Sequence, residues 1–193
     1  MQKAFGAPAV FTGEKWLTDS AIVVDDGIIT NILPCADVPN AYFEHSRIVP
    51  AFIDVQVYGA SGRLLAVHPD VETLQAMYDS FAASGTIRFL PTVATNTTQV
   101  FKQSIDAVRA YWKAGGMGVH GLHLEGPWLN AEKSGAHVKE WIHAPQLEEV
   151  KDLLEYGAGV IKMITIAPEI CSQEIIDYLL SRNIILSAGH SNA

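Results

Sequence analysis

The sequence predicts an α/β fold in which a small N-terminal β appendage, residues 1–46, precedes part of a TIM-type (β/α)8 barrel, residues 47–193. Two observations lead to this prediction. Beyond residue 47, short apolar runs alternate with stretches of helical period, which is typical of parallel strands joined by helices. Polar side chains also follow the predicted strands, as they do at the carboxyl edge of a barrel, where such folds place their sites.

The appendage is predicted from short β-type runs at residues 9–11 and 21–24. Asp25-Asp26-Gly27 separates the second run from another apolar run at residues 28–32, and an Asp-Gly pair readily takes the positive φ angles of a tight hairpin turn. The following residues are polar and rich in turn formers until the character of the chain changes near residue 47, where we place the domain boundary.

About five of the eight barrel strands are expected in the second domain, at residues 48–57, 86–92, 118–125, 160–167 and 184–189. Helices are predicted between them because apolar residues recur with a period near 3.6 at residues 70–84 and 96–112. Pro145 suits the first turn of a third helix that Gly157 ends, and Ser172 is a good N-cap for a fourth.

An open, doubly wound sheet of five strands is the alternative fold. It would suit the length, because the chain has 193 residues and a complete barrel needs about 250. It is less favoured, since no glycine-rich phosphate loop follows the first strand of this domain. If the barrel prediction is correct, we expect the natural protein to continue beyond residue 193.

Composition excludes several classes of partner. The chain is 49% hydrophobic and 18% charged, with a net charge of −8 and a pI near 5.3, so it repels nucleic acid and anionic membrane surfaces. Apolar runs long enough to span a membrane are missing, and the N-terminus lacks the pattern of an export signal. Cys35 and Cys171 are far apart in the sequence, which favours the reducing cytoplasm.

Two strand ends carry side chains that can bind a metal. Glu125 ends one predicted strand before Gly126-Pro127, and His190 directly follows the fifth strand. A carboxylate and an imidazole, with at least one more ligand and an open position, suit a catalytic zinc or iron ion. Each residue alone has a simpler interpretation, since a lone strand-end Glu often forms a structural ion pair and a lone His often packs in a core.

Several motifs carry a resemblance to a known family. They are PAFIDVQ at residues 50–56, LPT at 90–92, HLEGPWLN at 123–130, KSGAH at 133–137, IAPE at 166–169 and SAGHSNA at 187–193. Their order and spacing resemble those of N-acetylglucosamine-6-phosphate deacetylases of the amidohydrolase superfamily, along nearly the whole chain.

The resemblance implies a β-sandwich appendage, a metal-dependent hydrolase barrel, and one divalent ion, zinc or iron, held by Glu125 and His190. A third histidine ligand and the aspartate that transfers protons would lie downstream of residue 193. Ala136 and His137 match substrate-binding positions, and Gln56 matches a position close to the metal. The implied reaction releases acetate from N-acetylglucosamine 6-phosphate, a phosphorylated amino sugar, in a cytoplasmic enzyme that we expect to be a homodimer.

Tyr58 departs from this family pattern. Many amidohydrolases carry His-x-His after the first strand, whereas this chain has Gln56 and Tyr58, which supply no imidazole for a second metal. The loop at residues 59–63 is also less rich in glycine than the loop of the family. Two alternatives therefore stay open: an amidohydrolase acting on another amide, and a non-catalytic fragment or binding module that ends before its third ligand.

Overall fold

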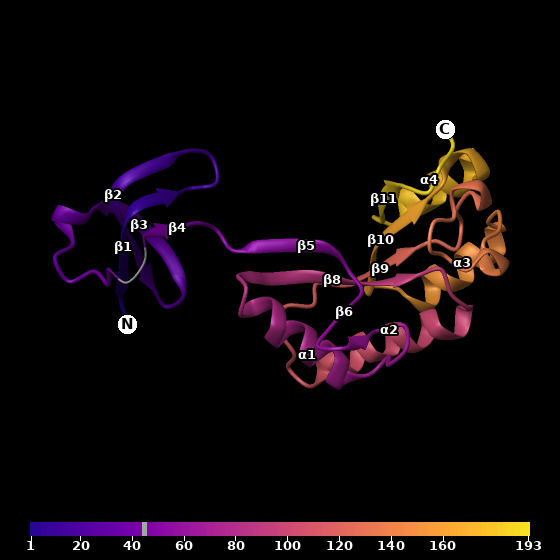
Figure 1. The fold of residues 1–193 in the computed structure, drawn as a ribbon, viewed down its shortest axis with the longest axis horizontal. Helices are drawn as coiled ribbons and strands as arrows, with labels where there is room; N and C mark the ends of the chain where they lie inside the picture. The colour runs from indigo at the N-terminus through magenta and orange to yellow at the C-terminus, as the bar shows by residue number, and fades with distance from the viewer. Residues whose placement is uncertain (44–45) are drawn as a thin grey trace. The chain divides into compact units, whose positions relative to one another are not determined.

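The computed structural model describes residues 1–43 and 46–193. His45, which the sequence does not assign to the metal site, lies outside the described residues. The contacts of the chain divide it into two compact units, Met1–Ala51 and Phe52–Ala193 (Figure 1).

The first unit contains a four-stranded sheet in the order β3-β2-β1-β4. Its strands are β1 (Lys3–Phe11), β2 (Trp16–Asp25), β3 (Ile28–Pro34) and β4 (Arg47–Ile48), and a short 3-10 turn, η1 (Cys35–Asp37), follows β3. The predicted hairpin is confirmed, since β2 and β3 pair antiparallel on either side of Asp26 and Gly27. Both turn residues have positive φ angles, 47° and 82°, as a type I′ turn requires.

The described residues of this unit form a single sheet with β4 at its edge, which is one layer of the expected β-sandwich appendage. One expectation for this region was wrong. Ile48 was expected in the first barrel strand, yet it pairs with Val10 of β1 in parallel. The next strand begins only at Phe52, after Pro50, whose ring removes a backbone donor.

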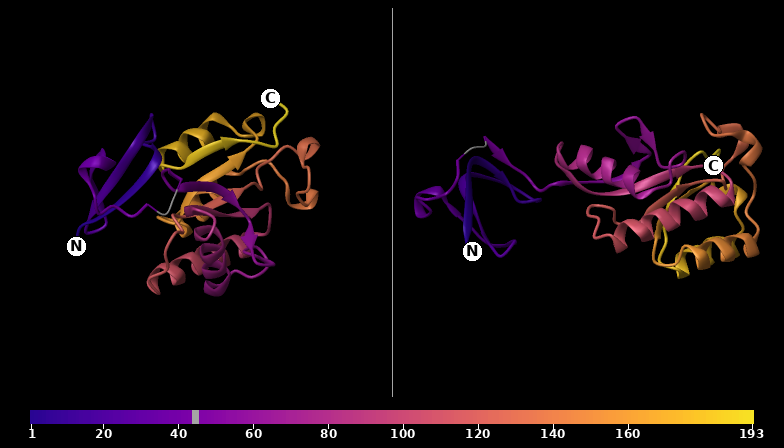
Figure 2. Two further views of the ribbon diagram at one scale, coloured as in Figure 1. Left: turned by 60° about the vertical axis from the view of Figure 1, so that its left-hand side comes forward. Right: turned by 90° about the horizontal axis from the view of Figure 1, so that it is seen from below.

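The second unit is built on a five-stranded parallel sheet in the order β11-β10-β9-β8-β5. These strands are β5 (Phe52–Val57), β8 (Thr86–Ala94), β9 (Leu122–Glu125), β10 (Ile161–Ile166) and β11 (Ile185–Ala188). Their order in space follows the order of the chain, whereas a doubly wound sheet reverses direction at a switch point. The doubly wound alternative is therefore wrong (Figures 1 and 2).

Four helices connect these strands, and their ends follow the capping signals of the sequence. They are α1 (Val71–Ala82), α2 (Thr98–Lys113), α3 (Leu147–Tyr156) and α4 (Gln173–Ser181). Asp70, Thr97 and Ser172 each accept a hydrogen bond from a backbone N–H of the first turn, and Gly157 ends α3. Pro145 lies just before α3 and not in its first turn.

The core of the second unit lies between the helices and the sheet. Fully buried side chains from α1, β8, α2, β9 and β10 meet there, among them Leu74, Phe89, Phe101, Leu124 and Ile164. A two-stranded hairpin, β6 (Gly59–Ala60) with β7 (Arg63–Leu64), and short 3-10 turns η2 (Ala131–Lys133), η3 (Lys139–Trp141) and η4 (Pro168–Ile170) follow the strand ends. Among the described residues, no helix is long and apolar enough to cross a membrane.

Candidate metal centre

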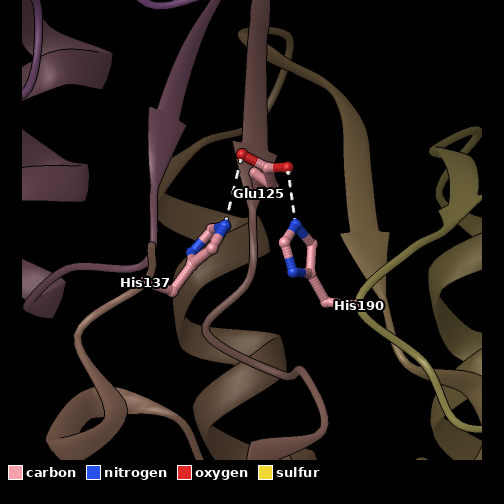
Figure 3. Close-up of side chains that lie close together, drawn as sticks. All are labelled: Glu125, His137 and His190. Carbon is pink, nitrogen blue, oxygen red and sulfur yellow. Dashed lines mark hydrogen bonds and ion pairs between the residues drawn. The ribbon is translucent and has the colours of Figure 1, made fainter. Parts of the chain in front are cut away.

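Glu125 is the last residue of β9, and its buried side chain points into a cluster formed by segments that follow other strands. His190 comes two residues after β11, and His137 lies in the long connection between β9 and α3. The three side chains offer ligand atoms that all lie within 4.8 Å of one another. Figure 3 shows the two imidazoles approaching the carboxylate, one toward each oxygen.

His190 presents a lone pair to Glu125. Its Nδ1 lies 2.8 Å from the carbonyl oxygen of Lys133, which can only accept, so Nδ1 carries the proton of the neutral ring. In this neutral tautomer the opposite nitrogen, Nε2, is an acceptor that faces Oε1 of Glu125 at 3.2 Å, whereas a protonated ring would form an ion pair with the same oxygen. Two acceptors that face each other at this distance are stabilised by a cation between them. The hydrogen bond from Nδ1 to the Lys133 carbonyl is also the kind of contact that commonly orients a metal-binding histidine.

The separation of these two atoms suits a bound metal ion. Tetrahedral zinc holds its nitrogen and oxygen ligands at about 2.1 Å, which places two ligand atoms about 3.4 Å apart. The 3.2 Å between Glu125 Oε1 and His190 Nε2 is close to that value. The residues present therefore fit a divalent metal with mixed oxygen and nitrogen ligands.

His137 presents a proton instead of a lone pair. The backbone N–H of Thr95 donates to its Nδ1 at 3.3 Å, and the Thr95 hydroxyl lies 2.8 Å from the same nitrogen. With Nδ1 accepting, the proton of the neutral ring is on Nε2, which lies 3.5 Å from Oε2 of Glu125. Burial lowers the pKa of His137, while the nearby Glu125 carboxylate raises it, and burial prevails. His137 is thus arranged as a neutral hydrogen-bond donor.

Gln56 and Tyr58 hold the other side of the Glu125 carboxylate. Gln56 Nε2 donates to Oε1 at 2.9 Å, and the Tyr58 hydroxyl donates to Oε2 at 2.6 Å. The same amide group of Gln56 also donates to the Tyr58 oxygen at 2.8 Å. Burial and the hydrogen bond to Glu125 raise the pKa of Tyr58, so the phenol keeps the proton that it donates.

Behind the cluster, His123 connects several strands of the sheet. Its Nδ1 lies 2.8 Å from the carbonyl oxygen of Val55 in β5, and its Nε2 lies 2.8 Å from the hydroxyl of Thr165 in β10. Burial lowers the pKa of this fully buried ring, so it stays neutral. Val55 directly precedes Gln56, and His123 therefore fixes the strand that carries Gln56 relative to the strand that carries Glu125.

The structure brings together four of the five site residues singled out in the sequence. Glu125, His190, His137 and Gln56 meet in one cluster, whereas the side chain of Ala136 is exposed beside His137. Arg63, in the loop at residues 59–63, donates to Asp70 and Thr73 and does not contact the cluster.

Two contributors to the cluster were missed in the sequence. From the sequence, Tyr58 was noted only because it supplies no imidazole, but its hydroxyl contacts Glu125. Thr95, which contacts His137, was not noted at all. Tyr58 lies two residues after Gln56 on the same side of an extended segment, which is a signal that could have placed both side chains at Glu125.

Comparisons with known proteins found similar chains and a similar fold. The family model described as the NagA composite domain matches residues 4–45. N-acetylglucosamine-6-phosphate deacetylase of Haemophilus influenzae is 32% identical over 95% of this chain and 49% of its own length. The crystal structure of N-acetylglucosamine-6-phosphate deacetylase from Pasteurella multocida superposes with a TM-score of 0.87 at 34% identity, covering 100% of this chain and 52% of that one.

The chain belongs to the N-acetylglucosamine-6-phosphate deacetylase family. Its relatives include an N-acetylgalactosamine-6-phosphate deacetylase from a Shewanella species, 35% identical over 90% of this chain and 45% of its own length. The chain spans about half the length of the curated relatives that it matches. Both of these relatives are named as deacetylases, which are hydrolases of amide bonds.

Proposed function

We propose that the protein carrying this chain hydrolyses the acetamide of an N-acetylated amino sugar 6-phosphate, with N-acetylglucosamine 6-phosphate as the first candidate. The observation that supports this most strongly is the pair Glu125 Oε1 and His190 Nε2, which face each other at 3.2 Å although one ends β9 and the other follows β11, with β10 between these strands. The names of the relatives supply the substrate class, since they act on glucosamine or galactosamine derivatives.

Glu125 and His190 would hold one divalent metal ion, zinc or iron, with a further ligand from outside this chain. Such an ion would polarise the amide carbonyl as a Lewis acid, and it would lower the pKa of water, so that hydroxide is available to attack the carbonyl near neutral pH. Gln56 and Tyr58 keep the carboxylate in a fixed orientation through their hydrogen bonds to its two oxygens. With two donors already on the carboxylate, Glu125 loses little freedom when a metal binds.

His137 would bind the substrate. Its Nε2–H is held toward the Glu125 carboxylate by the two contacts of Thr95 to Nδ1. A donor in that place can move its hydrogen bond to the sugar or to the oxygen on which negative charge develops. Ala136, exposed next to it, would leave room for the sugar. The proton for the departing amine would come from a group outside this chain.

We further propose that the five strands are part of a (β/α)8 barrel, with Met1–Ala51 as its appendage and Phe52–Ala193 as its barrel portion, because β4 pairs with β1 of the appendage. The consecutive strand order supports this, because a barrel winds its strands in sequence and a doubly wound sheet does not. The free thiols of Cys35 and Cys171 are in keeping with a cytoplasmic enzyme. A homodimer remains our expectation.

Acetate release by the full-length protein tests the proposed function. We would supply N-acetylglucosamine 6-phosphate, N-acetylgalactosamine 6-phosphate and unphosphorylated N-acetylglucosamine at equal concentration, and measure acetate and free amine. The proposal expects turnover of at least one phosphorylated sugar well above that of the unphosphorylated one. Equal rates with and without phosphate would remove the phosphosugar assignment, and release from none of the three would remove the deacetylase assignment.

A further inference from the structure

Glu169 lies in η4, directly after β10, and its exposed carboxylate joins two segments that are distant in the sequence. Oε1 accepts from the side-chain amide of Asn130 at 2.9 Å and from the backbone N–H of Asn192 at 2.7 Å. Oε2 accepts from the hydroxyl of Ser191 at 2.7 Å. One carboxylate therefore fastens the loop after β9 to the two residues that follow His190.

His190, the residue next to this junction, has an unusual backbone. Its φ angle is +50°, in the left-handed region that residues with a side chain rarely adopt. The surrounding segments must hold it there. The backbone N–H of Asn130 donates to the His190 carbonyl at 3.0 Å, and Asn192 Nδ2 donates to Glu132 at 3.3 Å.

The left-handed conformation matters for the direction of the ring. Lys133, whose carbonyl accepts from His190 Nδ1, belongs to the same loop as Asn130. If the segment of Ser191 and Asn192 moved away from this loop, the ring would lose that carbonyl. His190 Nε2 would then no longer be held 3.2 Å from Glu125.

The carboxyl group of Glu169 is ionised at neutral pH, and its hydrogen bonds favour this charged form. The backbone N–H of Asn192, then the Ser191 hydroxyl and the Asn130 amide, lower the pKa of Glu169 to about 2. Both of its oxygens are occupied by these donors, so the carboxylate is not arranged as a ligand itself.

We propose that Glu169 is a positioning residue for His190: by fastening Ser191 and Asn192 to Asn130, it keeps His190 in the conformation that presents Nε2 to Glu125. This inference rests on the proposed function, because it assigns Glu169 to the metal centre without contact between Glu169 and the metal. It predicts that Glu169 changes metal affinity from outside the ligand set, as groups that orient metal ligands do, by about 10-fold to 100-fold.

The test uses the full-length protein and its Glu169→Ala, Glu169→Gln and Glu155→Gln variants. Glu155 is an exposed glutamate of α3 and serves as the control for loss of one surface charge. The zinc dissociation constant is measured by competition with a chelating dye. The second readout is the imidazole tautomer of His190 in the metal-free protein, from nitrogen NMR shifts after histidine labelling with assignment by His190→Ala.

We expect Glu169→Ala to weaken zinc binding by about tenfold or more and to reduce the Nδ1–H tautomer of His190. Glu169→Gln keeps one acceptor oxygen, so it should lose less affinity, and Glu155→Gln should match the wild type. If Glu169→Ala lowers the melting temperature too far for measurement, Glu169→Gln takes its place.

A change in zinc affinity below threefold, together with an unchanged tautomer in the variant used, overturns the proposal. The metal site and the role of Glu169 are tested by different results. Normal zinc binding by His190→Ala would show that His190 is not a metal ligand. The tautomer of His190 in the metal-free protein would still show whether Glu169 positions the ring.

Discussion

Glu125 Oε1 and His190 Nε2 face each other at 3.2 Å, although 65 residues separate them in the chain. In the neutral ring of His190, the carbonyl of Lys133 fixes the proton on Nδ1, so the nitrogen that faces Glu125 is an acceptor like the oxygen opposite. This pair is what a metal-dependent deacetylase requires of its ligands, and the residues around it can be tested separately.

Replacing Tyr58 by Phe removes the donor 2.6 Å from Glu125 Oε2 and keeps the ring. The carboxylate then loses one of the contacts that orient it, and we expect zinc affinity to fall about tenfold. Chelator competition measures the change. Tyr178→Phe, on α4 and away from the cluster, is the matched control, and wild-type affinity in Tyr58→Phe would count against an orienting role.

Replacing His137 by Ala should separate substrate binding from metal binding. Because its Nε2 is arranged as a donor, the variant should keep its metal, while turnover falls by about 10²-fold to 10³-fold, as for loss of a hydrogen bond to a developing oxyanion. Metal analysis and steady-state acetate release on the same preparation measure both effects. Loss of the metal from His137→Ala would show that His137 is a ligand.

Glu169 should contribute to stability in a defined pH range. Its pKa is lowered to about 2 in the folded protein from an ordinary value of 4.5, so its contribution is present above pH 4.5 and is lost as the pH falls toward 2. The melting temperatures of wild type and Glu169→Gln should therefore differ most above pH 4.5 and converge between pH 4.5 and 2. A difference that stays constant over this range would contradict the pKa argument.

Much of this fold could be predicted from local patterns. The spacing of Phe101, Ile105 and Val108 indicated α2, and all three side chains are buried. The Asp-Gly pair indicated the turn between β2 and β3, since its positive φ angles depend on those two residues alone. Glu125 and His190 were recognisable because each follows an apolar strand run.

The remainder depends on contacts between distant parts of the chain. Ile48 pairs with Val10, so it belongs to the sheet of the first unit and not to the first barrel strand. The residues around Ile48 carry no signal that distinguishes pairing with the first sheet from pairing with the barrel sheet. The proton position of His137 is set by Thr95, 42 residues away, and that of His190 by Lys133, 57 residues away. Periodicity and capping rules carry no information about such pairs, so the roles of the two histidines could be separated only in the structure.

Metal content tests the central claim most directly. Full-length wild-type protein, Glu125→Gln, His190→Ala and the control His120→Ala, an exposed histidine outside the cluster, would be purified, dialysed and analysed for bound metals. Glu125→Gln keeps the size of the side chain and removes its charge. We predict about one tightly bound divalent ion per chain in the wild type and the control, and little in the other two. Full metal occupancy in both Glu125→Gln and His190→Ala would contradict the account.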